Sequence, residues 1–170
     1  MGGGGSDVPP QRVARRHRDT SHPRPALVAT LIRAAAASDV AGCAALLGQL
    51  GYPATPESLA RRLSILLPRD DYALRVAQHD AALVGLAAVH VFPAIHSDRP
   101  LAFIAALVVA EAQRGTGIGA RLVAELEAFA TRNGCDRIIV TTANHREGAH
   151  RFYDRLGYEF TGRRYAKSLI

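Results

Sequence analysis

The strongest chemical signal in the chain is a run of three glycines spaced two residues apart. Residues 114–120 read Arg-Gly-Thr-Gly-Ile-Gly-Ala, between an apolar stretch that suits a buried strand and an amphipathic stretch that suits a helix. Gly115, Gly117 and Gly119 lack the Cβ atoms that would hold a ligand away from the backbone. Because the first N–H groups of a helix lack intrahelical acceptors and lie at its positive end, this loop predicts a phosphate-binding site.

The spacing distinguishes between kinds of phosphate loop. A Walker loop ends in Gly-Lys followed by Ser or Thr, and no lysine lies near residues 114–120. A dinucleotide fingerprint is formally matched by Gly115, Gly117 and Ala120, but five residues separate Val109 from Gly115, and no acidic residue ends the next expected strand. A dinucleotide fold is therefore disfavoured, whereas a plain helix-capping turn stays open for the loop taken alone.

A second stretch of chemically capable residues lies downstream. Residues 144–158 read Asn-His-Arg-Glu-Gly-Ala-His-Arg-Phe-Tyr-Asp-Arg-Leu-Gly-Tyr. Together with residues 114–119, this stretch resembles the R/Q-x-x-G-x-G/A and N-x-x-A-x-x-F-Y-x-x-x-G-F/Y motifs of the GCN5-related N-acetyltransferases (GNAT), over about residues 27–170. The resemblance implies that the glycine loop holds the pyrophosphate of acetyl-coenzyme A and that Tyr153 lies beside the thioester sulfur.

The activity that this resemblance implies is an acetyl-CoA-dependent N-acetyltransferase, which is an acyltransferase. The acetyl group would move to a primary amine, expected to be that of a small molecule, by direct attack in a ternary complex. Tyr153 is the expected general acid for the departing thiolate, and a backbone N–H near Val109 is expected to stabilise the negative oxygen. The cofactor contacts implied are Leu107, Val108, Val109, Arg114, Gly115, Thr116, Gly117, Ile118, Gly119, Ala120, Asn144, Ala149, Phe152 and Tyr153.

One branch of the family is more similar than the rest. Residues 89–96, with His90 and His96, and the closing Gly-Arg-Arg-Tyr of residues 162–165 resemble the branch that includes the aminoalkylphosphonate N-acetyltransferases. This similarity implies a small amine acceptor with an anionic group that Arg163 or Arg164 attracts. The alternative is that both arginines are solvated on an edge strand, where positive charge discourages aggregation.

Two positions depart from the family pattern. The family's Asn stands three residues before the Ala, where this chain has Arg146, and Asn144 lies two residues earlier. Many relatives carry a Glu a few residues before the Leu-Val-Val of the cofactor strand, where this chain has Ala105. His90 and His96 are the candidates for a base or an acceptor-binding group, because an imidazole titrates near neutral pH. A water relay, or plain solvation of both rings, is the alternative.

The missing carboxylate keeps other functional classes open. One is a non-catalytic acetyl-CoA-binding sensor or interaction module, and another is a protein lysine or N-terminal acetyltransferase. The enzyme and the sensor both predict stabilisation by acetyl-CoA, but only the enzyme predicts thiol release with an amine present. No Cys or carboxylate cluster accompanies His90 and His96, so we expect no metal.

Length and composition limit the class of protein. The 170 residues fit one domain, and no apolar run approaches the roughly 20 residues that a membrane span needs. Cys43 and Cys135 form no C-x-x-C pair, which favours reduced thiols and a cytoplasmic protein. Half of the net charge of +6 lies in residues 1–25, which we expect to be a disordered extension, and the rest gives no support for a nucleic-acid partner.

The elements that must position these residues follow from the hydrophobic pattern. The resemblance implies one α/β (α+β) domain over residues 26–170, with a GNAT-like mixed, mostly antiparallel sheet flanked by helices. It also implies that the sheet splays between the two strands that end at Val109 and Thr142, with the cofactor in the splay. A homodimer is compatible with the resemblance, although nothing in the chain specifies one. The expected strands are residues 27–33, 72–79, 82–92, 101–109 and 137–142, with one or two more in 158–170, and the expected helices are residues 40–50, 56–67, 117–132 and 148–156.

Overall fold

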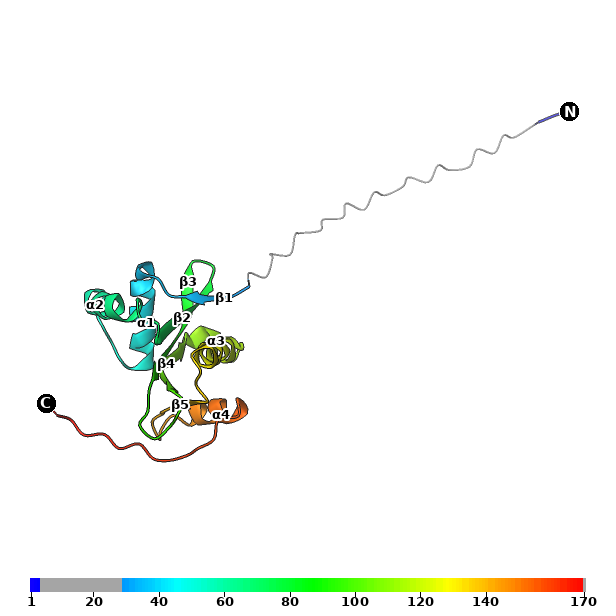
Figure 1. Cartoon of the computed structure of the whole chain (residues 1–170). Helices are drawn as coiled ribbons and strands as arrows, with labels where there is room; N and C mark the ends of the chain where they lie inside the picture. The colour runs from blue at the N-terminus through cyan, green and yellow to red at the C-terminus, as the bar shows by residue number, and fades with distance from the viewer. Residues whose placement is uncertain (4–28, 170) are drawn as a thin grey trace.

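The computed structural model describes residues 1–3 and 29–169 (Figure 1). Its centre is a five-stranded sheet in the order β1-β2-β3-β4-β5, antiparallel throughout except for the parallel pair β4–β5. The predicted mixed, mostly antiparallel sheet is confirmed. The strands are β1 (Leu31–Ala34), β2 (Tyr72–His79), β3 (Ala82–Phe92), β4 (Leu101–Val109) and β5 (Arg137–Val140).

Helices cover both faces of this sheet (Figure 1). On one face, α1 and α2 bury leucines and Cys43 against β2, β3 and the end of β4. On the other face, α3 and α4 pack against the alternate side chains of the same strands. Two separate apolar clusters therefore hold the sheet rigid from both sides. The helices are α1 (Val40–Leu50), α2 (Pro56–Leu66), α3 (Ile118–Arg132) and α4 (Glu147–Arg155), with short 3-10 turns at Ala37–Asp39 and Glu111–Gln113.

Local sequence signals explain most of these boundaries. The Thr55 hydroxyl accepts a hydrogen bond from Ser58 N–H at the start of α2, and Pro56 occupies the first helical position, as predicted. Gly51 ends α1 with φ 97°. Asp80 has φ 52° in the tight connection between β2 and β3, a backbone region that Asp tolerates better than most residues. The predicted hairpin and both helix boundaries are confirmed.

The sheet opens between β4 and β5. The parallel ladder pairs Leu101 with Arg137 and ends with the pair Ile104 and Val140. Beyond Ile104, β4 continues to Val109 while β5 has already ended. The register between β3 and β4 also shifts here, leaving Ala105 as an exposed bulge residue in an otherwise covered strand. The predicted splay is therefore present, and it begins at Ala105.

Three predicted segments differ from the structure. The first strand begins at Leu31 rather than Leu27, and residues 27 and 28 lie outside the described residues, as does most of the predicted extension over residues 1–25. The strand predicted over residues 137–142 ends at Val140. The prediction of one or two strands over residues 158–170 is wrong for residues 158–169, which form none. The residues after Tyr158 are exposed and bury no apolar face, so nothing stabilises a strand there.

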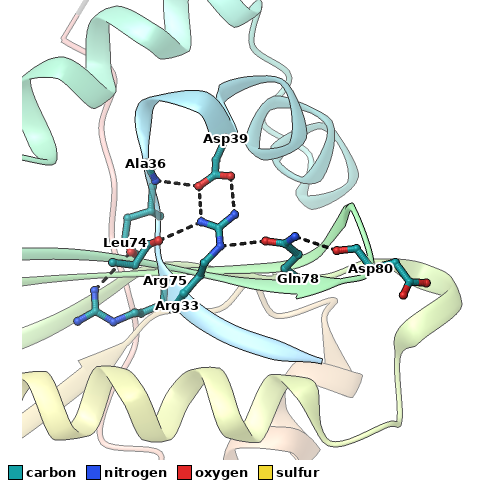
Figure 2. Close-up of polar contacts among 8 residues, drawn as sticks. Arg33, Ala36, Asp39, Leu74, Arg75, Gln78 and Asp80 are labelled. Carbon is teal, nitrogen blue, oxygen red and sulfur yellow. Dashed lines mark hydrogen bonds and ion pairs between the residues drawn. The ribbon is translucent and has the colours of Figure 1, made fainter. Parts of the chain in front are cut away.

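A buried ion pair fastens the start of α1 to the sheet (Figure 2). The Arg33 guanidinium donates to both carboxylate oxygens of Asp39, at 2.7 and 2.8 Å, and its Nε donates to the Gln78 amide oxygen. Asp39 is 8% exposed and also accepts the Ala36 N–H. Because each partner satisfies the others, this network is structural, and it holds β1, β2 and the start of α1 in place.

Candidate active site

The glycine loop lies between the end of β4 and the start of α3. Gly115 and Gly117 have φ values of 80° and 85°, which side chains with a Cβ rarely adopt. A Cβ at either position would meet no atom within 4 Å, so the backbone of the loop is open to its surroundings. Gly117 is the N-cap of α3, and no side chain caps this helix end. The loop therefore offers backbone N–H donors at the positive end of a fifteen-residue helix.

Gly119 has a different role from its two neighbours. A Cβ on Gly119 would lie 3.2 Å from the Phe152 ring, which fills the space beside α3. The missing side chain at residue 119 thus makes room for the Phe152 ring of α4. Contact of all three glycines with a ligand stays a prediction.

Tyr153 lies beside Phe152 in the apolar cluster that α3 and α4 form against the sheet. The two rings lie 5.2 Å apart in an edge-on arrangement, and Tyr153 is 9% exposed. Its other neighbour is Tyr158, at 5.3 Å, whose hydroxyl donates to the Glu127 carboxylate of α3. Burial raises the pKa of Tyr153 to about 12, so its phenol is neutral and carries a proton throughout the physiological range. The Tyr153 hydroxyl is therefore available as a proton donor at neutral pH.

The mouth of the splay carries an unsatisfied polar atom. Thr142 follows β5, and its hydroxyl is buried with no hydrogen-bond partner among the described residues. A buried hydroxyl without a partner costs free energy, so Thr142 marks a locally unsatisfied position just after β5. Four residues later, Arg146 donates to the Leu50 carbonyl at 2.7 Å and joins the β5–α4 connection to the end of α1. Neither residue was predicted to belong to the site, because their roles depend on where β5 ends.

The first wall of the splay is the free half of β4. Leu107 and Val109 are half-buried and pack towards α3 and α4, while Val108 is buried under α1. Arg114 turns back and donates from Nε to the Val109 carbonyl at 3.3 Å. The Gln49 side-chain oxygen accepts a hydrogen bond from the Glu111 N–H, which joins the segment before the glycine loop to α1. The Arg114 hydrogen bond thus joins the end of β4 to the glycine loop, while Val108 is buried on the other face of the sheet from Leu107 and Val109.

The remaining predicted cofactor residues are placed unevenly. Thr116 is exposed and donates to the Gln113 carbonyl, which tightens the turn before Gly117. Ile118 is buried, Ala120 is half-buried, and Ala149 packs against the core of α3 and α4. Asn144 is exposed in the connection between β5 and α4. Ile118 and Ala149 therefore belong to the packing between α3 and α4, whereas Asn144 is exposed to solvent.

The two candidate histidines lie in different surroundings. His90 is half-buried on β3, paired in register with Tyr72 and Phe103, and its ring lies 5.7 Å from that of Phe92. Its Nε2 lies 3.6 Å from the Asp71 carboxylate. His96 is exposed in the connection between β3 and β4. His90 is thus held by neighbours on three sides, whereas His96 is not held by a contact among the described residues.

Other features of the surface point to no further reactive group. A shallow cavity of about 400 Å³ lies between α1 and the β2–β3 turn, where Arg33, Asp39 and Gln78 already satisfy one another. Across residues 29–169, no group of three or more His, Cys, Asp or Glu side chains is arranged to hold a metal ion. Over the same part of the chain, no helix has the length and apolar character that crossing a bilayer requires.

Comparison with known proteins agrees with this geometry. Residues 43–158 match the model of the acetyltransferase (GNAT) family. The chain is 33% identical over 127 residues to the aminoalkylphosphonate N-acetyltransferase of Salmonella typhimurium, covering 75% of this chain and 80% of that protein.

Solved structures show the same fold. A transcriptional regulator from Bacillus halodurans is 26% identical, with a TM-score of 0.77 over 83% of this chain and all of that one (100%). An aminoglycoside N-acetyltransferase in complex with CoA is 20% identical, with a TM-score of 0.76 over 88% of this chain and 99% of that one. The open sheet, the glycine loop and the match over two thirds of the sequence show that this chain belongs to the acetyltransferase (GNAT) family.

Proposed function

We propose that this protein transfers the acetyl group of acetyl-CoA to the primary amine of a small molecule, by direct attack in a ternary complex. The observation that carries the proposal is the splay: β4 runs five residues beyond its last pair with β5, directly into the glycine loop. An extended ligand arm can hydrogen-bond the free edge of β4 while its phosphates reach the start of α3.

The described residues fit acetyl-CoA at this place. Gly115 and Gly117 leave the loop backbone open, and no side chain caps the N-terminal end of α3. When bound, acetyl-CoA supplies an activated thioester, and the protein's own groups orient it and manage protons.

Three groups carry out the proton transfers and charge stabilisation in this proposal. Tyr153 gives its proton to the departing sulfur, because a phenol is protonated at neutral pH and can act as a general acid. The backbone N–H near Val109 stabilises the oxygen that becomes negative. His90 is the proposed base for the amine. Typical strand dimensions place its backbone roughly 8 Å from Ala105, where many relatives carry Glu, a gap that the imidazole and a water molecule can span.

The acceptor in this proposal is a small amine with an anionic group. The Salmonella relative is named for aminoalkylphosphonates, which carry both groups. Arg164 supports the proposal because its guanidinium reaches the Thr141 hydroxyl at 3.4 Å, at the end of β5 and beside the splay. Arg163 and His96 are further candidates for acceptor contact. We also propose a cytoplasmic location, on the ground that Cys43 and Cys135 are both free thiols.

Measuring thiol release tests the proposal. The purified protein is mixed with acetyl-CoA and a panel of amines: aminoalkylphosphonates, neutral alkylamines and a lysine-containing peptide. Release that requires a small anionic amine supports the proposal. Acetyl-CoA binding without release under any condition would instead assign a sensing module, which the named transcriptional regulator among its structural relatives makes the main rival. Release only with the peptide would assign a protein acetyltransferase.

A further inference from the structure

Arg69 and Asp71, just before β2, form a short row of side chains that leads to His90 on β3. Arg69 and Asp71 form a two-pronged ion pair, with Nε to Oδ1 at 2.8 Å and NH2 to Oδ2 at 2.6 Å. The same Oδ2 atom lies 3.6 Å from His90 Nε2. The backbone fixes the spacing, because the Val91 N–H donates to the Asp71 carbonyl at 2.7 Å. Asp71 is therefore shared between a permanent cation and an imidazole.

The other neighbours of His90 orient the ring without adding charge. The Tyr72 and Phe92 rings lie 6.4 and 5.7 Å from it, and Phe103 is its partner in register on β4. Burial raises the pKa of Tyr72, so its phenol is neutral at the pH of the reaction. Among the described residues that surround His90, the charge therefore comes from Asp71 and, through it, from Arg69.

We infer that Asp71 is the positioning residue of His90 and that Arg69 sets how strongly Asp71 acts on it. This inference rests on the proposed acetyl transfer and deepens it by naming the groups that tune its base. Asp71 orients the imidazole by facing Nε2, which leaves Nδ1 as the nitrogen that accepts the proton of the amine. Arg69 binds the same carboxylate, so it weakens the electrostatic stabilisation that Asp71 gives to the protonated His90 ring.

The proton balance of the step follows from this arrangement. The amine nitrogen forms the bond to the acetyl carbon, the carbon–sulfur bond breaks, and the amine's proton passes to His90 Nδ1. Tyr153 gives its proton to the sulfur, and solvent exchange restores both groups. The imidazolium formed at His90 faces Asp71, whose pKa is held below its ordinary value mainly by the hydrogen bonds from Arg69, so Asp71 remains a carboxylate.

Removing the negative charge of Asp71 and removing the positive charge of Arg69 should shift the acidic limb of the kcat/KM–pH profile in opposite directions. Asp71→Asn removes the negative charge, which moves that limb about 0.5 pH unit lower and reduces kcat about threefold. Arg69→Gln releases the carboxylate, which moves the limb about 0.5 pH unit higher. Asp70→Asn and Arg61→Gln are the matched controls, because they change the same charges without an ion pair to Asp71 or His90.

An NMR titration of the His90 ring separates this inference from the proposed function. The midpoint of the His90 ring signals moves down in Asp71→Asn and up in Arg69→Gln, relative to the parent protein, and stays in place in both controls. Movement in one direction in both variants, or no movement in either, overturns the inference. Because the ring titration needs no turnover, it gives an answer even if the protein releases no thiol, the result that would overturn the enzyme proposal instead.

Discussion

The Phe152 ring occupies the space that a side chain on Gly119 would fill, at 3.2 Å from the position of the missing Cβ. This contact couples the first turn of α3 to the middle of α4. The helix that offers backbone donors for an anion is thereby locked to the helix that carries Tyr153. Packing at one glycine therefore fixes the relation between the two halves of the candidate site.

The coupling can be measured by a double-mutant cycle. Gly119→Ala gains helix propensity but presses a methyl group against Phe152, whereas in a Phe152→Leu background the same change meets no ring. We expect a coupling free energy of about 1 kcal/mol between the two positions, measured by urea unfolding. Gly148→Ala in α4 is the control: a Cβ there meets nothing within 4 Å, so it stabilises by about 0.5–1 kcal/mol. Additive effects at residues 119 and 152 would contradict the packing argument.

The open glycines of the loop predict a specific loss of affinity. Gly117→Ala forces a Cβ into the left-handed conformation at φ 85° and strains the backbone donors at the start of α3. We expect acetyl-CoA to bind at least about tenfold more weakly in calorimetry, with stability reduced by about 1 kcal/mol. Gly134→Ala, at φ 76° beyond the other end of α3, carries the same strain away from the site and should retain affinity. Equal affinity losses in both variants would contradict the loop's role.

Replacing Tyr153 should lower kcat without weakening the binding of acetyl-CoA. Tyr153→Phe keeps the ring that packs against Phe152 and Tyr158 and removes the proton donor. We expect kcat to fall about 100-fold while the calorimetric Kd for acetyl-CoA stays within about twofold of the parent value. Tyr52→Phe, on a ring that is 64% exposed, is the matched control. An unaltered kcat in Tyr153→Phe would remove the proposed acid from the account.

The ion pair at the start of α1 predicts a pH-dependent stability. Hydrogen bonds from Arg33 hold the pKa of Asp39 below its ordinary value. A carboxyl group whose pKa is lower in the folded state stabilises the fold above its unfolded pKa, near 4, and loses that contribution as the pH falls through the folded value.

Asp39→Asn should therefore cost about 2 kcal/mol of unfolding free energy at pH 7, since it leaves the half-buried Arg33 without its counter-ion. The difference from the parent protein should shrink at pH 3, where the parent has also begun to lose the pair. Asp98→Asn, on an exposed residue of the β3–β4 connection, serves as control. A difference of equal size at both pH values would show that the charge of Asp39 is not what stabilises the start of α1.

Much of the fold follows from local sequence signals. The caps at Thr55 and Gly51 and the apolar runs of Tyr72–His79 and Ala82–Phe92 are properties of a few neighbouring residues, which is why those elements were predicted correctly. Residues 158–169 show the limit of this reasoning. A strand needs a partner edge and a face to bury, and neither is visible in the sequence of these residues.

The candidate site shows the same division. The glycine loop and Tyr153 were predicted because motif spacing is a local property, and the splay followed from the family resemblance. The contacts of Arg146 and Asp71 join residues 96 and 19 positions apart, and the burial of the Thr142 hydroxyl depends on where β5 ends, so single-sequence reasoning missed them. Asp71 could have been found, because the hairpin register already places Tyr72 opposite His90.

The location of acetyl-CoA is the central claim, and hydrogen–deuterium exchange with and without the molecule tests it most directly. The account predicts slower exchange in two segments, residues 105–109 on the free half of β4 and residues 115–120 in the glycine loop, with little change in α2. Protection confined to other segments, such as the cavity between α1 and the β2–β3 turn, or no protection at saturating acetyl-CoA, would contradict it.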